Sequence, residues 1–442
     1  MRVHKRTVRR LFVLVFMILV AGCSGNSGQN SADGQPNRRE EDPYVSSDPK
    51  GKNETGKKSD NPKAFWPYRL TNTMVTEEFA FLPPIACGAR RFFDVASGQD
   101  VVYCFEPNCE HHAPHYDVAS RKMLDDTCTA YHLGERAFFL QKEAGYYYSD
   151  PCLYRTDREG RSQKVIAKIE EPLEHRWEEL YTQSQYVLTY TNDYEYRLVQ
   201  SGDGTVWVPG ETVGEKREAG VVMVSLTDGK YSFIYRSSEQ YSSWTENLYE
   251  YDGHLYFDCH YLDVSENSLP SIIDDYEKNI VQYREEYKKH IHYEIYDCDL
   301  TTGEIRMILK VDHPVGEIGF GEGFFFVFAD YNYPEYPAVL YRMDGSIIRE
   351  LTVPAQRMAM SDGPVVVLHV FDNGVSYYLY DTETDEILNR MEVSSYGTFD
   401  LVATLGDSYY GNTHGKDGLV IAWIRKEDFW NREFSKAVKF DR

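Results

Sequence analysis

The sequence predicts an all-β fold of the β-propeller type. Three observations lead to this prediction: a recurring two-strand hairpin, the spacing of its copies, and the many Tyr and Phe residues in the strands. The clearest copies lie at 296–305 and 379–387, where Asp and Thr side chains can bond the amides of the turn and Gly or Asp can take the left-handed conformation. Weaker copies lie at 93–98, 154–160, 224–229 and 341–345. Short strands that recur at a fixed, longer period favour a propeller over a sandwich.

Each repeating unit is expected to open with a turn and a short aromatic strand, which precede the hairpin. Such openings lie at 134–140, 185–190, 252–257, 321–327, 362–368 and 406–410, and a poorer seventh unit covers about 79–104. We expect the last strands, 419–424 and 437–440, to pair with the N-terminal strands. That pairing would close the ring and remove exposed sheet edges.

The length of the chain predicts the number of blades. Three stretches do not fit the repeat and are interpreted as insertions: about 105–133, 193–218 and 262–290. Without them, seven blades would hold about 42 residues each, within the roughly 40–45 of a four-stranded blade. Six blades would need about 49 residues each and eight about 37. Seven blades are predicted, and six is the alternative.

The insertion at 262–290 predicts one surface helix. Pro270 and Ser271 mark a plausible start. Apolar residues then recur at helical spacing, at Ile273, Tyr276, Ile280, Tyr283 and Tyr287. We expect this face to pack on the helix's own blade rather than on a partner.

The N-terminus has the order of a secretory signal, which we assign to residues 1–22. A basic segment at 1–10 precedes an apolar run at 11–20, which is too short to span a bilayer core of roughly 20 residues. Residues 23–62 are rich in Ser, Gly, Asn, Asp, Lys and Pro, and we expect them to form a disordered tether of roughly 35 Å end to end. The propeller is then assigned to residues 63–442.

The charge of the chain argues against nucleic-acid binding. The formal charge is −23, and removal of residues 1–22, which carry five Lys or Arg, takes it to −28. So acidic a surface repels phosphate backbones.

One cysteine cluster has the donors of a structural zinc site: Cys104, Cys109, His111 and Cys128. The alternative is one or two disulfides among these cysteines, Cys87 and Cys152, which an oxidising exterior favours. In either case the cluster would staple the insertion at 105–133 rather than catalyse a reaction. Apart from this zinc alternative, no cofactor is expected.

Two further cysteines, Cys259 and Cys298, are expected to be buried and free. In the predicted hairpin Cys259 lies opposite about Tyr293 and Cys298 opposite about His254, which is too far apart for a disulfide.

Acidic pairs such as Asp125–Asp126, Glu178–Glu179 and Asp274–Asp275 are expected by chance in so acidic a chain. No phosphate loop, Ser elbow or HExxH motif is present, and so no catalytic residue is assigned.

Val20, Ala21, Gly22 and Cys23 resemble the lipobox of bacterial lipoproteins, and with the hairpins the chain resembles a bacterial surface lipoprotein with a TolB-like or WD40-like propeller. The resemblance implies cleavage before Cys23, acylation of Cys23, and a lipid anchor in the cell membrane that faces the exterior or periplasm. It also implies a binding or scaffolding module for a protein, peptide or glycan rather than an enzyme. The chain lacks the Gly-His and Trp-Asp pairs of WD40 proteins, and so no binding residues are transferred. The alternative function is an extracellular carbohydrate-active hydrolase or lyase that uses carboxylates of the propeller face.

Overall fold

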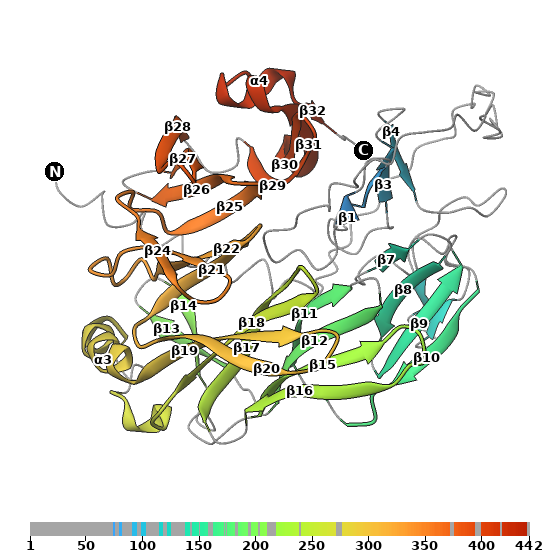
Figure 1. Cartoon of the computed structure of the whole chain (residues 1–442), viewed down its shortest axis with the longest axis horizontal. Helices are drawn as coiled ribbons and strands as arrows, with labels where there is room; N and C mark the ends of the chain where they lie inside the picture. The colour runs from blue at the N-terminus through green and yellow to red at the C-terminus, as the bar shows by residue number, and fades with distance from the viewer. Residues whose placement is uncertain are drawn as a thin grey trace. The chain divides into compact units, whose positions relative to one another are not determined.

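The computed structural model describes strands between residues 74 and 141 and most of residues 144–439 (Figure 1). The gaps in the second range are 150, 158–161, 172, 174, 182–183, 193–195, 202–203, 210–217, 238–239, 271–275, 372–374, 394–398 and 416–417. All described residues belong to the unit Ala64–Arg442.

The described strands form seven four-stranded antiparallel sheets, each a meander in which neighbouring strands follow one another along the chain, apart from one inserted hairpin. Sheet 1 holds β1 (Met74–Val75), β2 (Phe79–Phe81), β3 (Arg91–Asp94) and β4 (Gln99–Val102). Sheet 2 holds β7 (Phe138–Gln141), β8 (Ala144–Ser149), β9 (Cys152–Asp157) and β10 (Lys164–Lys168). Sheet 3 holds β11 (His175–Tyr181), β12 (Gln185–Thr191), β15 (Ala219–Ser225) and β16 (Tyr231–Ser237).

The remaining sheets continue the same order. Sheet 4 holds β17 (Tyr241–Tyr251), β18 (His254–Leu262), β19 (Ile291–Asp299) and β20 (Ile305–Val311). Sheet 5 holds β21 (Val315–Gly321), β22 (Phe324–Ala329), β23 (Val339–Arg342) and β24 (Ile347–Glu350). Sheet 6 holds β25 (Arg357–Asp362), β26 (Val365–Phe371), β27 (Val375–Asp381) and β28 (Glu386–Val393). Sheet 7 holds β29 (Asp400–Leu405), β30 (Ser408–Gly415), β31 (Gly418–Arg425) and β32 (Val438–Lys439). The prediction of an all-β fold of short antiparallel strands is therefore confirmed.

The turns have the chemistry that the sequence predicts. Asp299 Oδ1 accepts hydrogen bonds from the amides of Thr301 and Thr302, at 2.7 and 2.9 Å. In sheet 6, Asp381 Oδ1 accepts two amides of its turn in the same way, at 2.8 and 3.0 Å. Gly303 closes the first turn with a φ of 72°, a conformation that glycine adopts without steric cost.

The three insertions carry elements outside the seven sheets. The first contains the hairpin β5 (His115–Asp117) and β6 (Lys122–Leu124), and the second contains β13 (Tyr196–Ser201) and β14 (Gly204–Pro209). The third contains the short 3-10 helix η1 (Glu266–Ser268) and helix α3 (Tyr276–His290). Tyr283 and Tyr287 of α3 pack on a core cluster of Leu262, Leu269 and Ile291, as expected of a helix that covers its own sheet. Within the described part of the chain, no helix combines the length and apolar character needed to cross a bilayer.

The expected pairing of N- and C-terminal strands is wrong for the described strands. The segment at 426–436 forms helix α4 (Lys426–Trp430) and the 3-10 helix η2 (Phe434–Lys436), which return the chain to its own sheet. As a result β32 pairs with β31, with Trp423 opposite Val438. Strands β1–β4 form a sheet of their own.

The hydrophobic core lies between consecutive sheets. One cluster joins Phe326 and Phe328 of sheet 5 to Met358, Leu368 and Tyr380 of sheet 6. Equivalent clusters join sheet 2 to 3, sheet 3 to 4, sheet 4 to 5 and sheet 6 to 7. The first strands also lie next to one another in order, β11 beside β17, then β21, β25 and β29.

Carboxylates link neighbouring first strands at their bulges. The ladder of β17 is interrupted between Glu246 and Tyr249, and there the Leu248 amide donates to Glu178 Oε2 of sheet 3 at 2.8 Å. Two sheets further along, the Met358 amide at the bulge of β25 in sheet 6 donates to Glu317 Oε1 of sheet 5 at 3.3 Å. A bulge disrupts the strand ladder, and each carboxylate accepts an amide there.

We predict that Glu317→Ala destabilises the protein by about 1.5–3 kcal/mol, the usual contribution of a hydrogen bond to a charged group. Glu317→Gln should cost less, because its amide oxygen can still accept the Met358 N–H. Urea unfolding of both variants checks this. Equal losses for Ala and Gln would show that the accepted hydrogen bond is not what stabilises this junction.

Candidate functional site

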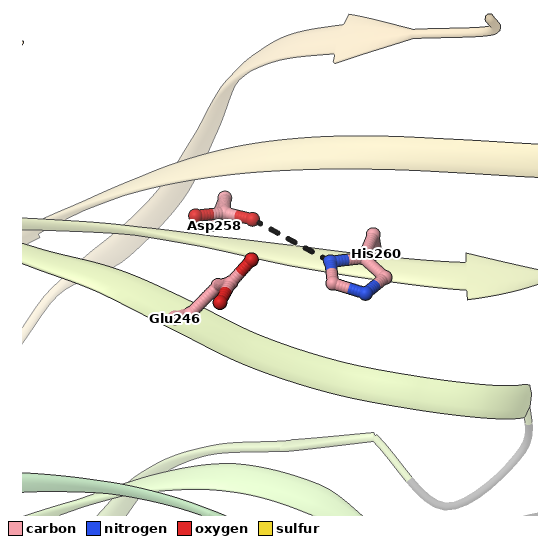
Figure 2. A group of neighbouring side chains, drawn as sticks. All are labelled: Glu246, Asp258 and His260. Carbon is pink, nitrogen blue, oxygen red and sulfur yellow. Dashed lines mark ion pairs between the residues drawn. The ribbon is translucent and has the colours of Figure 1, made fainter. Parts of the chain in front are cut away.

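Among the described residues, one group of three side chains that could hold a metal ion lies on the first two strands of sheet 4 (Figure 2). Glu246 on β17 is paired directly with Asp258 on β18, and His260 lies two residues further on the same face of β18. One donor atom from each of the three side chains lies within 4.8 Å of the others. We call these residues the acid–histidine group.

Asp258 is the buried member of the group, with 1% of its surface exposed. Its Oδ1 accepts a hydrogen bond from Asn247 Nδ2 at 2.6 Å. Its Oδ2 has no hydrogen-bond partner, and His260 Nδ1 lies 3.8 Å away, too far for a hydrogen bond. Burial raises the pKa of Asp258, and His260, which helps to lower it, does not compensate fully.

The bulge in β17 aims Asn247 at Asp258. Asn247 has a φ of 60°, in the left-handed region where Asn is among the tolerated residues. This conformation occurs between Glu246 and Tyr249, where the pairing register shifts. Bulges often re-aim a side chain in this way.

Aromatic rings hold the imidazole of His260. The Trp244 ring lies nearly parallel to it with centroids 6.3 Å apart, and the Tyr293 ring lies 5.0 Å away. Tyr293 is itself fixed, since its hydroxyl donates to the Val315 carbonyl at 3.1 Å. The group therefore presents one imidazole and two carboxylates in a restricted arrangement, a donor set suited to a divalent cation.

A half-buried acid, Glu179, has one buried carboxylate oxygen in sheet 3, among tyrosines. Glu179 Oε2 and the hydroxyls of Tyr181 and Tyr186 are buried. Burial raises the pKa of Glu179 to about 8, against the opposing effect of the positive charge of Arg176. Near neutral pH this side chain is thus largely protonated in the folded protein.

Only some of the residues predicted from the sequence lie in the described part of the structure. Val20, Ala21, Gly22 and Cys23, and the cluster Cys104, Cys109, His111 and Cys128, lie outside the described residues and stay predictions. Cys259 and Cys298 are buried and free, as predicted, although their partners are Glu294 and Leu255, one residue from the expected register. Cys152 is also free.

The Glu178–Glu179 pair does not form an acid–base pair. Adjacent residues of a strand point to opposite faces, and here Glu178 bonds the Leu248 amide while Glu179 lies among tyrosines. The pairs Asp125–Asp126 and Asp274–Asp275 lie outside the described residues.

Sequence reasoning missed the acid–histidine group. A signal was present, because Asp258 and His260 interrupt an apolar, aromatic strand in which most other side chains are buried. Without strand pairing, nothing connected them to Glu246, twelve residues earlier than Asp258.

Comparison with known proteins gives similarity to solved structures alone: no family model and no curated protein matches the sequence. Dipeptidyl peptidase 4 of Porphyromonas gingivalis has 9% identity and a TM-score of 0.49, over 86% of this chain and 60% of the peptidase. Oligogalacturonate lyase of Vibrio parahaemolyticus has 10% identity and a TM-score of 0.45, over 81% and 90%. TolB of Acinetobacter baumannii has 12% identity and a TM-score of 0.32, over 78% and 75%. Likeness at this level transfers neither an activity nor site residues.

We predict that Glu179→Gln is more stable than the wild type at pH 8 and equal to it near pH 4. Between about pH 4.5 and pH 8 the unfolded chain releases the Glu179 proton while the folded chain keeps it, so that wild-type stability falls as pH rises. Above pH 8 the difference should be constant. Unfolding at several pH values checks this, with Glu383→Gln at an exposed turn as the control for general charge effects. A stability difference that does not change between pH 4 and 8 would contradict the prediction.

Proposed function

We propose that the chain is a seven-bladed β-propeller that serves outside the cell as a binding or scaffolding module, held at the membrane by a lipid on Cys23. The observation that carries the proposal is the run of seven four-stranded meander sheets, of which sheets 2–7 share cores in chain order. This is the repeat of a propeller, in which each blade covers the next.

The number of sheets supports seven blades rather than six. In the proposed ring, sheet 1 would lie beside sheet 7 and cover its free face, although none of the described strands is exchanged between them. Packing of sheet 1 against sheet 7 would close the ring and cover their exposed faces, and it would not require an N-terminal strand to pair with a C-terminal one.

The anchor part of the proposal is drawn from the sequence. Val20, Ala21, Gly22 and Cys23 follow a short apolar run, and residues 23–62 would hold the propeller away from the lipid surface. A rigid propeller at the end of a tether suits capture of a protein, peptide or glycan.

Metabolic labelling with an alkyne fatty acid tests the anchor. The full chain should be labelled when expressed in a bacterium, and Cys23→Ser should lose the label, because the thiol is the acceptor. Ser24→Ala, one residue further on, should keep it. Label that persists in Cys23→Ser would contradict the lipid assignment, and loss in both variants would point to a processing defect rather than to Cys23.

The second candidate is an extracellular carbohydrate-active hydrolase or lyase. In its favour, a Glu246 and an Asp258 oxygen lie within 4.8 Å, near the roughly 5 Å separation of retaining glycosidases. Against it, Asp258 is 1% exposed, and a carboxylate that acts on a sugar must touch it. Turnover of cell-wall or dietary glycans that Glu246→Gln abolishes would support the enzyme and contradict the binding module. Saturable glycan or peptide binding without turnover would support the module.

A further inference from the structure

We propose that Glu246, Asp258 and His260 bind one divalent transition cation of the zinc or manganese class between β17 and β18, with Asn247 as a positioning residue.

The pairing of β17 with β18 brings two carboxylates together, and a bound cation would offset their repulsion. Glu246 and Asp258 are directly opposite in an antiparallel pair, and like charges in that position destabilise a sheet. Asp258 is also buried, where an ionised carboxylate without compensation is costly. A bound dication would neutralise both carboxylates.

The hydrogen bonds of Asp258 leave one oxygen for a ligand. Asn247 occupies Oδ1, and Oδ2 is buried without a hydrogen-bond partner on the side of Glu246 and His260 (Figure 2). An outer residue that fixes one oxygen of a carboxylate and frees the other is a common device of metal sites.

The distances suit a site that needs little rearrangement. Ligand atoms at about 2.0–2.2 Å from a tetrahedral zinc lie about 3.4 Å from one another. Asp258 Oδ2 and His260 Nδ1 are 3.8 Å apart, and all three donor atoms fit within 4.8 Å. Side-chain shifts of about 1 Å would bring the donors to bonding distance.

The donor types narrow the choice of cation. Imidazole suits zinc and other transition metals, whereas calcium and magnesium prefer oxygen ligands alone. Three protein ligands would leave a fourth position open, as in sites that also bind water or a ligand group.

The neighbouring sheets provide an internal comparison. Glu317 occupies the corresponding place in sheet 5, but its partner across the strands is Phe328, and its carboxylate accepts the Met358 amide. In sheet 3, the Glu178 amide donates to Thr189 Oγ1 at 3.1 Å, and the Glu178 carboxylate accepts the Leu248 amide. Among the described residues of sheets 3, 4 and 5, sheet 4 alone combines an acid opposite the first-strand Glu, which is Asp258, with a histidine two residues later, which is His260.

Full-length protein, stripped with a chelator, is titrated with MnCl₂ and followed by electron paramagnetic resonance, with ZnCl₂ titrated calorimetrically alongside. Manganese discriminates against the cysteine cluster, because thiolates favour softer metals. A second preparation carrying Cys104→Ser and Cys128→Ser removes that cluster from the zinc count. We expect about one manganese per chain, and a raised melting temperature with the metal bound.

Three variants and one control decide the assignment. Asp258→Asn and Glu246→Gln should abolish saturable binding. Asn247→Gly keeps a residue that favours positive φ but removes the amide, and should weaken binding about 10- to 100-fold while the metal-free protein keeps its circular dichroism. Its melting temperature without metal should fall, because the buried Asp258 carboxylate loses the hydrogen bond from Asn247. Glu317→Gln, at the matching place in sheet 5, should bind as the wild type does.

The proposal is overturned if the wild type binds neither cation saturably, or if a folded Asp258→Asn binds with unchanged stoichiometry and affinity. Should Asp258→Asn fail to fold, Glu246→Gln decides, because Glu246 is a proposed ligand, and unchanged affinity there removes the site. Unchanged affinity in Asn247→Gly removes the positioning role of Asn247. The outcome is independent of the labelling of Cys23, so failure here leaves the anchored module untouched.

Discussion

No four-stranded sheet of this chain can keep both of its faces out of water unless a neighbour covers each one. In β22 all six residues are buried, so consecutive side chains, which point to opposite faces, all need apolar surroundings. Second strands such as β22 and β26 therefore read as nearly continuous apolar runs rather than as alternating patterns. Large aromatic rings fill the space between sheets, and Phe325, Phe326 and Phe328 are almost fully buried there. The sequential stacking of the sheets follows from this requirement.

The first strands of sheets 3 to 7 face a different constraint, because each of them carries a bulge. In sheets 4 to 7 a charged residue of the first strand lies opposite the fifth residue of the second: Glu246 opposite Asp258, Glu317 opposite Phe328, Arg357 opposite His369 and Asp400 opposite Asn412. In sheet 5 this residue is Glu317, whose carboxylate accepts a hydrogen bond from the Met358 amide of sheet 6. His369 is buried, which together with Arg357 lowers its pKa and keeps it neutral. The charged residue at this first-strand position thus has a different polar environment in different sheets.

Much of the fold was predictable from local chemistry. Asp299 and Gly303 identify a turn because an Asp side chain and a glycine at positive φ are what the turn needs. The insertions were found because they interrupt the repeat, and α3 because its tyrosines follow a helical period. Strand pairing across long distances was not predictable: β32 pairs with β31 only after α4 has reversed the chain. The acid–histidine group was not predicted for the same reason, because only the pairing register of β17 and β18 brings Glu246 next to Asp258.

The acid–histidine group shows how a repeat can acquire a specialised site with few changes. The first-strand Glu is already part of the architecture, as Glu178 and Glu317 show by bonding the next sheet. In sheet 4 the added residues are Asp258 and His260 on one face of β18, with Asn247 at the existing bulge. An acid placed at so buried a position costs stability unless something positive accompanies it, and His260 at 3.8 Å is too far to supply a hydrogen bond. The free-energy cost of burying the Asp258 carboxylate would therefore be relieved when a cation binds, and this relief would contribute to the affinity for the cation.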